Sequence, residues 1–168
     1  MMKYLVLALA ALPLAVLPAQ AARAPHMHIA SLAELPVVEP APYDVDADAN
    51  AAVDAAFARA RKSGKRVLID MGGNWCPDCI VLANVMQLPE LKRFLAVHFE
   101  IVKVDAGRFD KNMDIPARFG LGKPEGVPAV YIATPHGKLV NAGHVTELDN
   151  DRTMTPQGIA NWLAQWAK

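Results

Sequence analysis

The chain contains two cysteines, Cys76 and Cys79, and only two residues separate them. A disulfide between them would close a loop too short to restrict much of the unfolded chain, so structural stabilisation explains the pair poorly. Two neighbouring thiols can instead exchange disulfides. One sulfur attacks a substrate disulfide, and the other breaks the mixed disulfide that results. The spacing therefore indicates redox chemistry carried by this pair.

The elements expected around the pair favour Cys76 as the attacking thiol. The apolar run 67–71 is typical of a central strand that is covered on both faces. A glycine-rich turn follows, and Pro77 suits the first turn of a helix that we expect to reach about residue 87. At a helix start, the first sulfur meets free N–H groups and the positive end of the helix dipole, which stabilise a thiolate. Cys79 lies about one turn further in and suits the resolving role.

A pair of cysteines with this spacing is also half of a zinc site. Zinc needs two further ligands, and the sequence holds no second cysteine pair and no H-x-x-x-H spacing among its five histidines. The triplet His26, Met27 and His28 could bind copper, although a single triplet of this kind is typical of a solvated segment. We therefore expect no metal at the cysteines and leave open whether the triplet binds one.

Hydrophobic periodicity and turn residues outline an α/β domain. Asp46 and Asp48 offer N-cap carboxylates for a first helix, which Ser63-Gly64 ends. The expected elements, in chain order, are this helix, the strand 67–71, the helix from Cys76, a helix from Pro89, the strand 98–104, a short helix near 116–119, the strand 129–133, its hairpin partner 138–142, and a last helix from Thr155-Pro156.

Two stretches together resemble the thioredoxin superfamily. The first joins the strand 67–71 to Trp75-Cys76-Pro77-Asp78-Cys79, like the strand, turn and Trp-Cys-x-x-Cys motif of that family. The second joins Arg118-Phe119-Gly120-Leu121 to Gly126-Val127-Pro128, like the segment that brings the family's cis-proline against the active site. The resemblance covers residues 48–168. It implies a thioredoxin-like fold, in which helices flank a central mixed sheet.

The resemblance implies a catalytic role for Asp70. This residue matches the family's buried acid, which relays a proton to the resolving sulfur, and burial would raise its pKa. An acid within an apolar strand is costly unless it has a function or a partner. The alternative is a carboxyl that turns to solvent at the strand end or caps the turn. Lys103, on the neighbouring expected strand, could pair with Asp70 or be solvated.

The resemblance also implies a substrate-binding edge at Val127 and Pro128. A cis bond between these two residues would expose the Val127 backbone to an incoming substrate strand. Trp75 is expected to pack beside the cysteines and shield them, and the alternative is an ordinary aromatic residue at the boundary between core and surface. These three residues therefore form the expected substrate-binding set.

The N-terminal segment has the pattern of a secretory signal peptide. Lys3 precedes an apolar run over residues 5–17, and Ala19-Gln20-Ala21 supplies a small-x-small cleavage site. The run is shorter than the ~20 apolar residues of a spanning helix, and retention as a membrane anchor is the alternative. We expect residues 1–21 to be removed by cleavage near Ala21, which makes the mature protein periplasmic or otherwise exported.

The mature chain is expected to consist of an arm and one domain. Residues 22–45 are rich in Ala and Pro without a sustained period, so they predict a linker or an extended arm before a domain over 46–168. The whole chain has 17 basic and 17 acidic residues, and loss of Lys3 with the signal peptide leaves 16 basic residues. This balance favours neither nucleic acid nor an anionic membrane surface as a partner.

These observations predict an exported thiol–disulfide oxidoreductase with no cofactor beyond the Cys76–Cys79 disulfide. Its expected partners are protein thiols and disulfides and a membrane electron donor, and we expect a monomer. The chain departs from thioredoxin itself in Pro77-Asp78, around residues 123–125 and in the loop 147–153. Those departures leave the substrate open.

Two residues between the cysteines favour a reductase over an oxidase. Asp78, if ionised, repels a thiolate at Cys76, and Pro77 removes an N–H group that could reach the sulfur. We therefore expect a reduction potential between about −270 and −200 mV and not near about −120 mV. A disulfide-forming oxidase stays open as an alternative. So does a binding module or copper chaperone, because two thiolates suit a soft ion.

Overall fold

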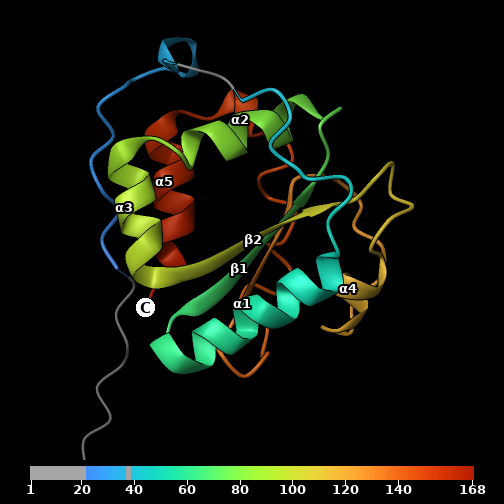
Figure 1. The fold of residues 1–168 in the computed structure, drawn as a ribbon. Coiled ribbons are helices and arrows are strands. Elements are labelled where there is room, and N and C mark those ends of the chain that lie inside the picture. Colours follow the sequence, from blue (N-terminus) through green and yellow to red (C-terminus); the bar gives the residue numbers. More distant parts are fainter. Residues whose placement is uncertain (1–21, 37–38) are drawn as a thin grey trace, which may run out of the picture.

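Three strands form the sheet of the computed structural model, which describes residues 22–36 and 39–168 (Figure 1). β1 (Arg66–Gly72) lies in the centre, parallel to β2 (Phe99–Asp105) and antiparallel to β3 (Ala129–Ala133). β1 is buried along almost its whole length, as expected for a strand that is covered on both faces. This mixed sheet confirms the predicted fold class. The expected signal peptide, residues 1–21, lies outside the described residues.

Helices cover both faces of the sheet (Figure 1). They are α1 (Ala49–Ser63), α2 (Pro77–Val85), α3 (Pro89–His98), α4 (Asp114–Ala117) and α5 (Pro156–Gln165). α1 and α4 pack on the face that carries Ile69, whereas α2, α3 and α5 pack on the face that carries Leu68. Because side chains alternate along a strand, Asp70 lies on the same face as Leu68. None of the helices in the described ranges is long and apolar enough to cross a membrane.

The helix ends follow the caps expected from the sequence. Asp48 accepts a hydrogen bond of 3.0 Å from the N–H of Ala51 at the start of α1. Gly64 ends that helix with φ of 76°, a left-handed conformation that glycine adopts without steric cost. Thr155 caps α5 through the N–H of Gly158. Local sequence therefore fixes where both helices begin.

The hairpin partner predicted over residues 138–142 is present only in part, because its backbone pairs with β3 through two hydrogen bonds, from Thr134 N–H to the Lys138 carbonyl and from Val140 N–H to the Ile132 carbonyl, both 2.8 Å. The structure holds a single isolated bridge there. Asn141 explains why the pairing stops there, because its side-chain amide takes the place of backbone pairing beyond Val140. Its Oδ1 accepts from the N–H of Ile132 at 2.9 Å, and its Nδ2 donates to the carbonyl of Val130 at 2.7 Å. Because the buried amide satisfies these two backbone groups of β3, they are not available to pair with the backbone of a longer fourth strand.

The N-terminal arm, residues 22–36 and 39–45, lies against the domain. Met27 and Tyr43 of the arm are buried, with 4% and 2% of their surface exposed. Three side-chain amides of the domain pair with the arm's backbone, each accepting from an N–H and donating to a carbonyl: Gln157 with Met27 and Pro25, Asn84 with Glu39, and Asn74 with Tyr43. These pairings replace the ladder that a neighbouring strand would provide. The arm therefore follows a defined path to the site.

Candidate active site

Cys76 and Cys79 form a disulfide at the start of α2. Cys76 is the N-cap of the helix, and its sulfur accepts a hydrogen bond of 3.1 Å from the N–H of Cys79. Cys76 keeps 4% of its surface exposed and Cys79 none. A donor that reaches the Cys76 sulfur also stabilises negative charge on it once the disulfide is reduced. This geometry fits Cys76 as the attacking thiol and Cys79 as the resolving one.

Val127 and Pro128 lie beside the reactive sulfur. The peptide bond between them is cis, and the Val127 carbonyl oxygen lies 3.4 Å from the Cys76 sulfur. Both residues come directly before β3. The structure thus brings the expected substrate-binding edge next to the expected nucleophile, and its pairing with a substrate strand stays a prediction.

Asp70 is fully buried in β1, which excludes a carboxyl turned to solvent. Its Oδ1 accepts a hydrogen bond of 2.9 Å from the Tyr43 hydroxyl. Burial raises the pKa of Asp70 to about 6, and the Tyr43 hydrogen bond and the charge of Lys103 oppose that rise. Lys103 faces Asp70 in the register of β1 and β2. A carboxyl with this pKa can accept and return a proton near neutral pH.

Asp78 has a partner that was not expected from the sequence. Its Oδ1 accepts hydrogen bonds from the backbone N–H of Arg152 at 3.2 Å and from the Arg152 Nε at 3.0 Å. The pair joins the first turn of α2 to the short helix η2 (Asp151–Thr153). The guanidinium opposes the repulsion between Asp78 and a thiolate at Cys76. The structure therefore weakens this part of the case for a reductase.

Asp151 is a second buried acid of the site, and nothing in the local sequence distinguishes it from its polar neighbours. Its side chain is fully buried, and neither carboxyl oxygen has a hydrogen-bond partner within residues 22–36 and 39–168. Burial raises the pKa of Asp151 to about 8, and the charges of Asp78 and Asp70 add to the rise. The cysteine pair thus lies above a cluster of three carboxyl groups.

We expect Asp151→Asn to remove a pH-dependent loss of stability. With a pKa of about 8 against an ordinary 3.8, the folded state keeps a proton that the unfolded state has released. This group therefore lowers the free energy of unfolding by about 1.4 kcal/mol per pH unit as pH rises from about 4 towards 8. Asparagine does not titrate, so the free energy of unfolding of the variant should increase relative to that of the wild type as pH rises over this range. Urea denaturation between pH 5 and pH 8 measures the difference, and parallel curves would contradict it.

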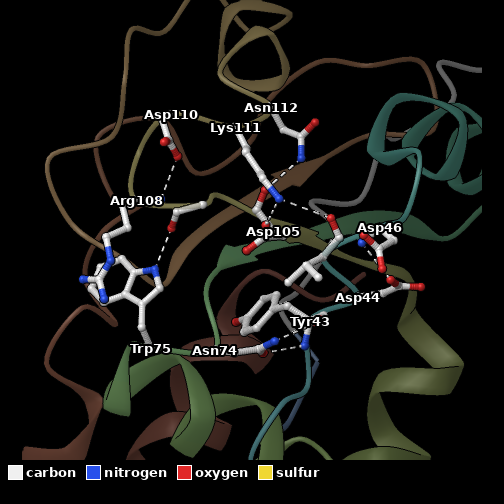
Figure 2. Close-up of polar contacts among 12 residues, drawn as sticks. Tyr43, Asp44, Asp46, Asn74, Trp75, Asp105, Arg108, Asp110, Lys111 and Asn112 are labelled. Atoms are coloured by element: carbon white, nitrogen blue, oxygen red, sulfur yellow. Dashed lines mark hydrogen bonds and ion pairs between the residues drawn. The ribbon is translucent and has the colours of Figure 1, made fainter.

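Trp75 forms a rim of the site on the side of the loop that follows β2 (Figure 2). Its side chain is partly exposed, and its Nε1 donates to the carbonyl of Gly107 at 2.6 Å. Arg108 lies over the ring, 4.9 Å from its centroid, and the ring of Phe109 lies 6.0 Å away. These contacts hold the indole in place at the edge of the site. Shielding of the cysteines by Trp75 stays a prediction.

Within the His26, Met27 and His28 triplet, the two histidine rings lie on the same side of the arm with their centroids 6.2 Å apart, and Met27 turns away from them. Met27 is buried in the core, whereas His26 and His28 are exposed on the arm. Successive side chains of extended backbone point to opposite sides, so the three groups cannot meet at one ion. Within the described parts of the chain, no group of three or more His, Cys, Asp and Glu side chains is placed to hold a metal.

Known proteins share both the sequence pattern and the shape of this chain. A family model described as thioredoxin-like matches residues 48–135. The solved structure of a disulphide isomerase from Xylella fastidiosa Temecula1 is 36% identical with a TM-score of 0.69, and the match covers 74% of this chain and 95% of that one. Protein disulfide-isomerases of Zea mays and Hordeum vulgare are 37% and 34% identical over 55% and 48% of this chain. These two matches span only 15% and 14% of the relatives' own lengths.

Proposed function

The chain belongs to the thioredoxin-like family, and on this basis we propose that it exchanges disulfides with proteins through Cys76 and Cys79. The observation that carries the proposal is the position of this disulfide at the N-terminus of α2, with buried Asp70 in the adjoining strand. The attacking sulfur has a backbone donor, and the site holds a carboxyl for the proton of the resolving thiol. The names of the relatives, disulfide isomerases, support the same activity.

In the first step, the Cys76 thiolate of the reduced protein attacks one sulfur of a substrate disulfide. A bond forms between the two sulfurs, and the other substrate sulfur leaves with the electron pair as a thiolate. The Val127 backbone would hold the substrate chain beside the Cys76 sulfur during this attack, and Trp75 would contact its apolar side chains. The product is a mixed disulfide between the protein and its substrate.

In the second step, the Cys79 sulfur attacks Cys76, and the second substrate sulfur leaves. Cys79 must lose its proton as it attacks, and Asp70 can accept that proton because its pKa is about 6. The substrate leaves as a dithiol, and its two electrons come from the cysteine pair. A dithiol donor must then reduce Cys76–Cys79 again. We expect this donor to be a membrane protein and the chain itself to act as a monomer.

The charges around the cysteine pair favour the direction of a reductase. A strong oxidant owes its potential to a stabilised reduced form, in which the attacking cysteine is a thiolate. Here three carboxyl groups, of Asp70, Asp78 and Asp151, share the site with the guanidinium of Arg152. Pro77 has no N–H to offer the sulfur. Asp151 keeps its proton near neutral pH and Arg152 offsets the charge of Asp78, so Asp70 is the carboxylate that opposes a thiolate. With the missing donor at Pro77, this charge raises the free energy of the thiolate, so the disulfide form is favoured and the pair is reducing.

Reduction of insulin with dithiothreitol as the electron donor tests this activity. We expect the wild type to accelerate the reaction and Cys76→Ser to leave it at the background rate. A copper chaperone would give the opposite pattern, with Cu(I)-dependent absorbance and no insulin turnover. Wild-type protein that leaves insulin reduction at the background rate would overturn the proposed function.

We propose that the protein acts outside the cytoplasm after loss of residues 1–21. Disulfides form and persist in such compartments, so a reductase has substrates there. We expect the exported protein to begin at Ala22, with the arm 22–45 before the domain 46–168. Intact-mass measurement of the exported protein checks this, and a mass that still includes residues 3–17 would contradict it.

A further inference from the structure

We propose that the Tyr43 hydroxyl carries the proton from Cys79 to Asp70 during the second step. The proposal rests on the proposed function, because it adds a residue to that site. Tyr43 belongs to the N-terminal arm and lies before residues 48–135, which the thioredoxin-like model matches. The arm would thus complete a site whose other parts belong to the domain.

The Tyr43 hydroxyl and the Cys79 sulfur border the same point beside Gly72. A Cβ atom added to Gly72 would lie 2.5 Å from the Tyr43 Oη and 2.8 Å from the Cys79 Sγ. Any larger residue would have to push one of these groups away, which explains a glycine at the end of a buried strand. The same hydroxyl donates to the Asp70 Oδ1 at 2.9 Å. It therefore contacts the buried acid directly and lies next to the resolving sulfur.

Asn74 fixes the backbone of Tyr43 (Figure 2). The Asn74 Oδ1 accepts from the Tyr43 N–H, and its Nδ2 donates to the Tyr43 carbonyl, each at 2.9 Å. Asn74 lies in the turn between β1 and α2, shortly before Cys76. The turn that presents the cysteines therefore also positions the tyrosine.

The transfer is balanced if two protons move together. As the Cys79 sulfur bonds to Cys76, its proton passes to the Tyr43 oxygen, and the hydroxyl proton of Tyr43 passes to Asp70. The bond between Cys76 and the substrate sulfur breaks, and that sulfur leaves with the electron pair. Burial and the charge of Asp70 raise the pKa of Tyr43 well above its ordinary value. Tyr43 is therefore neutral before and after the step, and no free phenolate forms.

Three titratable groups lie near Asp70 on the elements packed around it. Tyr43 comes from the arm, Lys103 from β2 and Asp151 from η2. Lys103 acts on Asp70 through its charge, and Tyr43 donates a hydrogen bond that lowers the pKa of Asp70. Asp151 has a pKa of about 8 and is therefore neutral while Asp70 titrates. Loss of the hydroxyl would therefore move the acid limb of the rate profile to higher pH. Loss of a relay would in addition lower the plateau above that limb.

Tyr43→Phe tests the relay because it keeps the ring and removes only the hydroxyl. Tyr131→Phe is its matched control, since Tyr131 is equally buried and its hydroxyl has no partner within the described residues. The reduced protein is mixed with dithiobis(nitrobenzoate). One thionitrobenzoate is released when Cys76 attacks and a second when Cys79 resolves the mixed disulfide, so one absorbance trace reports both steps.

We expect Tyr43→Phe to lower the plateau rate of the second phase, measured at pH values above the shifted acid limb, about tenfold or more. The first phase should stay within about twofold of the wild type, and Tyr131→Phe should change neither phase. In an Asp70→Asn background, Tyr43→Phe should have little further effect, because the relay has lost its acceptor. An unchanged plateau in Tyr43→Phe would overturn the relay, even if the acid limb moves.

The wild type provides a second test, which decides the matter if Tyr43→Phe does not fold. The rate of its second phase is measured in mixtures of H₂O and D₂O and plotted against the deuterium fraction. The plot should be curved, as expected when two protons transfer in the same step. A straight line would indicate one proton and overturn the relay. A wild type that releases no second thionitrobenzoate would instead overturn the proposed function, so the two failures can be told apart.

Discussion

Cys79→Ser is expected to trap substrates on Cys76 as stable mixed disulfides. In the wild type, the resolving sulfur is buried directly behind Cys76, and its attack is intramolecular. Without it, release depends on thiols from solution, which lack the high effective concentration of a group held in place. We expect release to slow by about a thousandfold or more. Non-reducing electrophoresis and intact mass of the variant mixed with a disulfide substrate measure the adduct.

Cys76→Ser is the control for this experiment. This variant keeps Cys79 but removes the sulfur that accepts a hydrogen bond from a backbone N–H at the start of α2. We therefore expect no adduct above background. An adduct that accumulates on Cys76→Ser and not on Cys79→Ser would reverse the two roles.

Asp70→Asn is expected to slow resolution and, at neutral pH, to stabilise the fold. The rate should fall about a hundredfold, because asparagine cannot accept the proton of Cys79. The gain in stability follows from the pKa of about 6 against an ordinary 3.8. The folded state holds a proton that the unfolded state releases, so wild-type stability falls by about 3 kcal/mol as pH rises from about 4 to about 6. The variant lacks this fall.

Stopped-flow exchange between pH 6 and pH 8 and urea denaturation measure the two effects of Asp70→Asn. Asp46→Asn is a suitable control, because it removes an exposed carboxylate at the start of the domain, directly after the arm. Equal exchange rates for Asp70→Asn and the wild type across this range would exclude Asp70 as the proton acceptor. A variant that is less stable than the wild type at every pH would contradict the raised pKa.

The cysteine pair and its supporting elements could be predicted because their signals are local. Asp48 caps α1 through a group three residues away, and Cys76 caps α2 in the same way. The apolar run of β1 is almost continuous, so its burial on both faces can be predicted without knowledge of its neighbours. Asp70 interrupts this run, and the interruption itself pointed to a buried acid.

The rest of the site depends on contacts between distant parts of the chain. Arg152 binds Asp78 from 74 positions away, and Tyr43 binds Asp70 from 27 positions away. No periodicity marks the arm, since side-chain amides of the domain pair with its backbone in place of a helix or strand. The shortened hairpin has a similar cause, because beyond Val140 the amide of Asn141 replaces the ladder that the residue pattern predicted.

The reduction potential of the Cys76–Cys79 disulfide tests the central claim most directly. Wild-type protein can be equilibrated with mixtures of reduced and oxidised thiol and then alkylated, which adds mass to free cysteines only. Mass spectrometry of the intact protein then gives the dithiol fraction at each potential. We expect one two-electron transition between about −270 and −200 mV. A potential above about −150 mV would identify an oxidant and contradict the reductase assignment. A pair that shows no transition at all would contradict disulfide exchange itself.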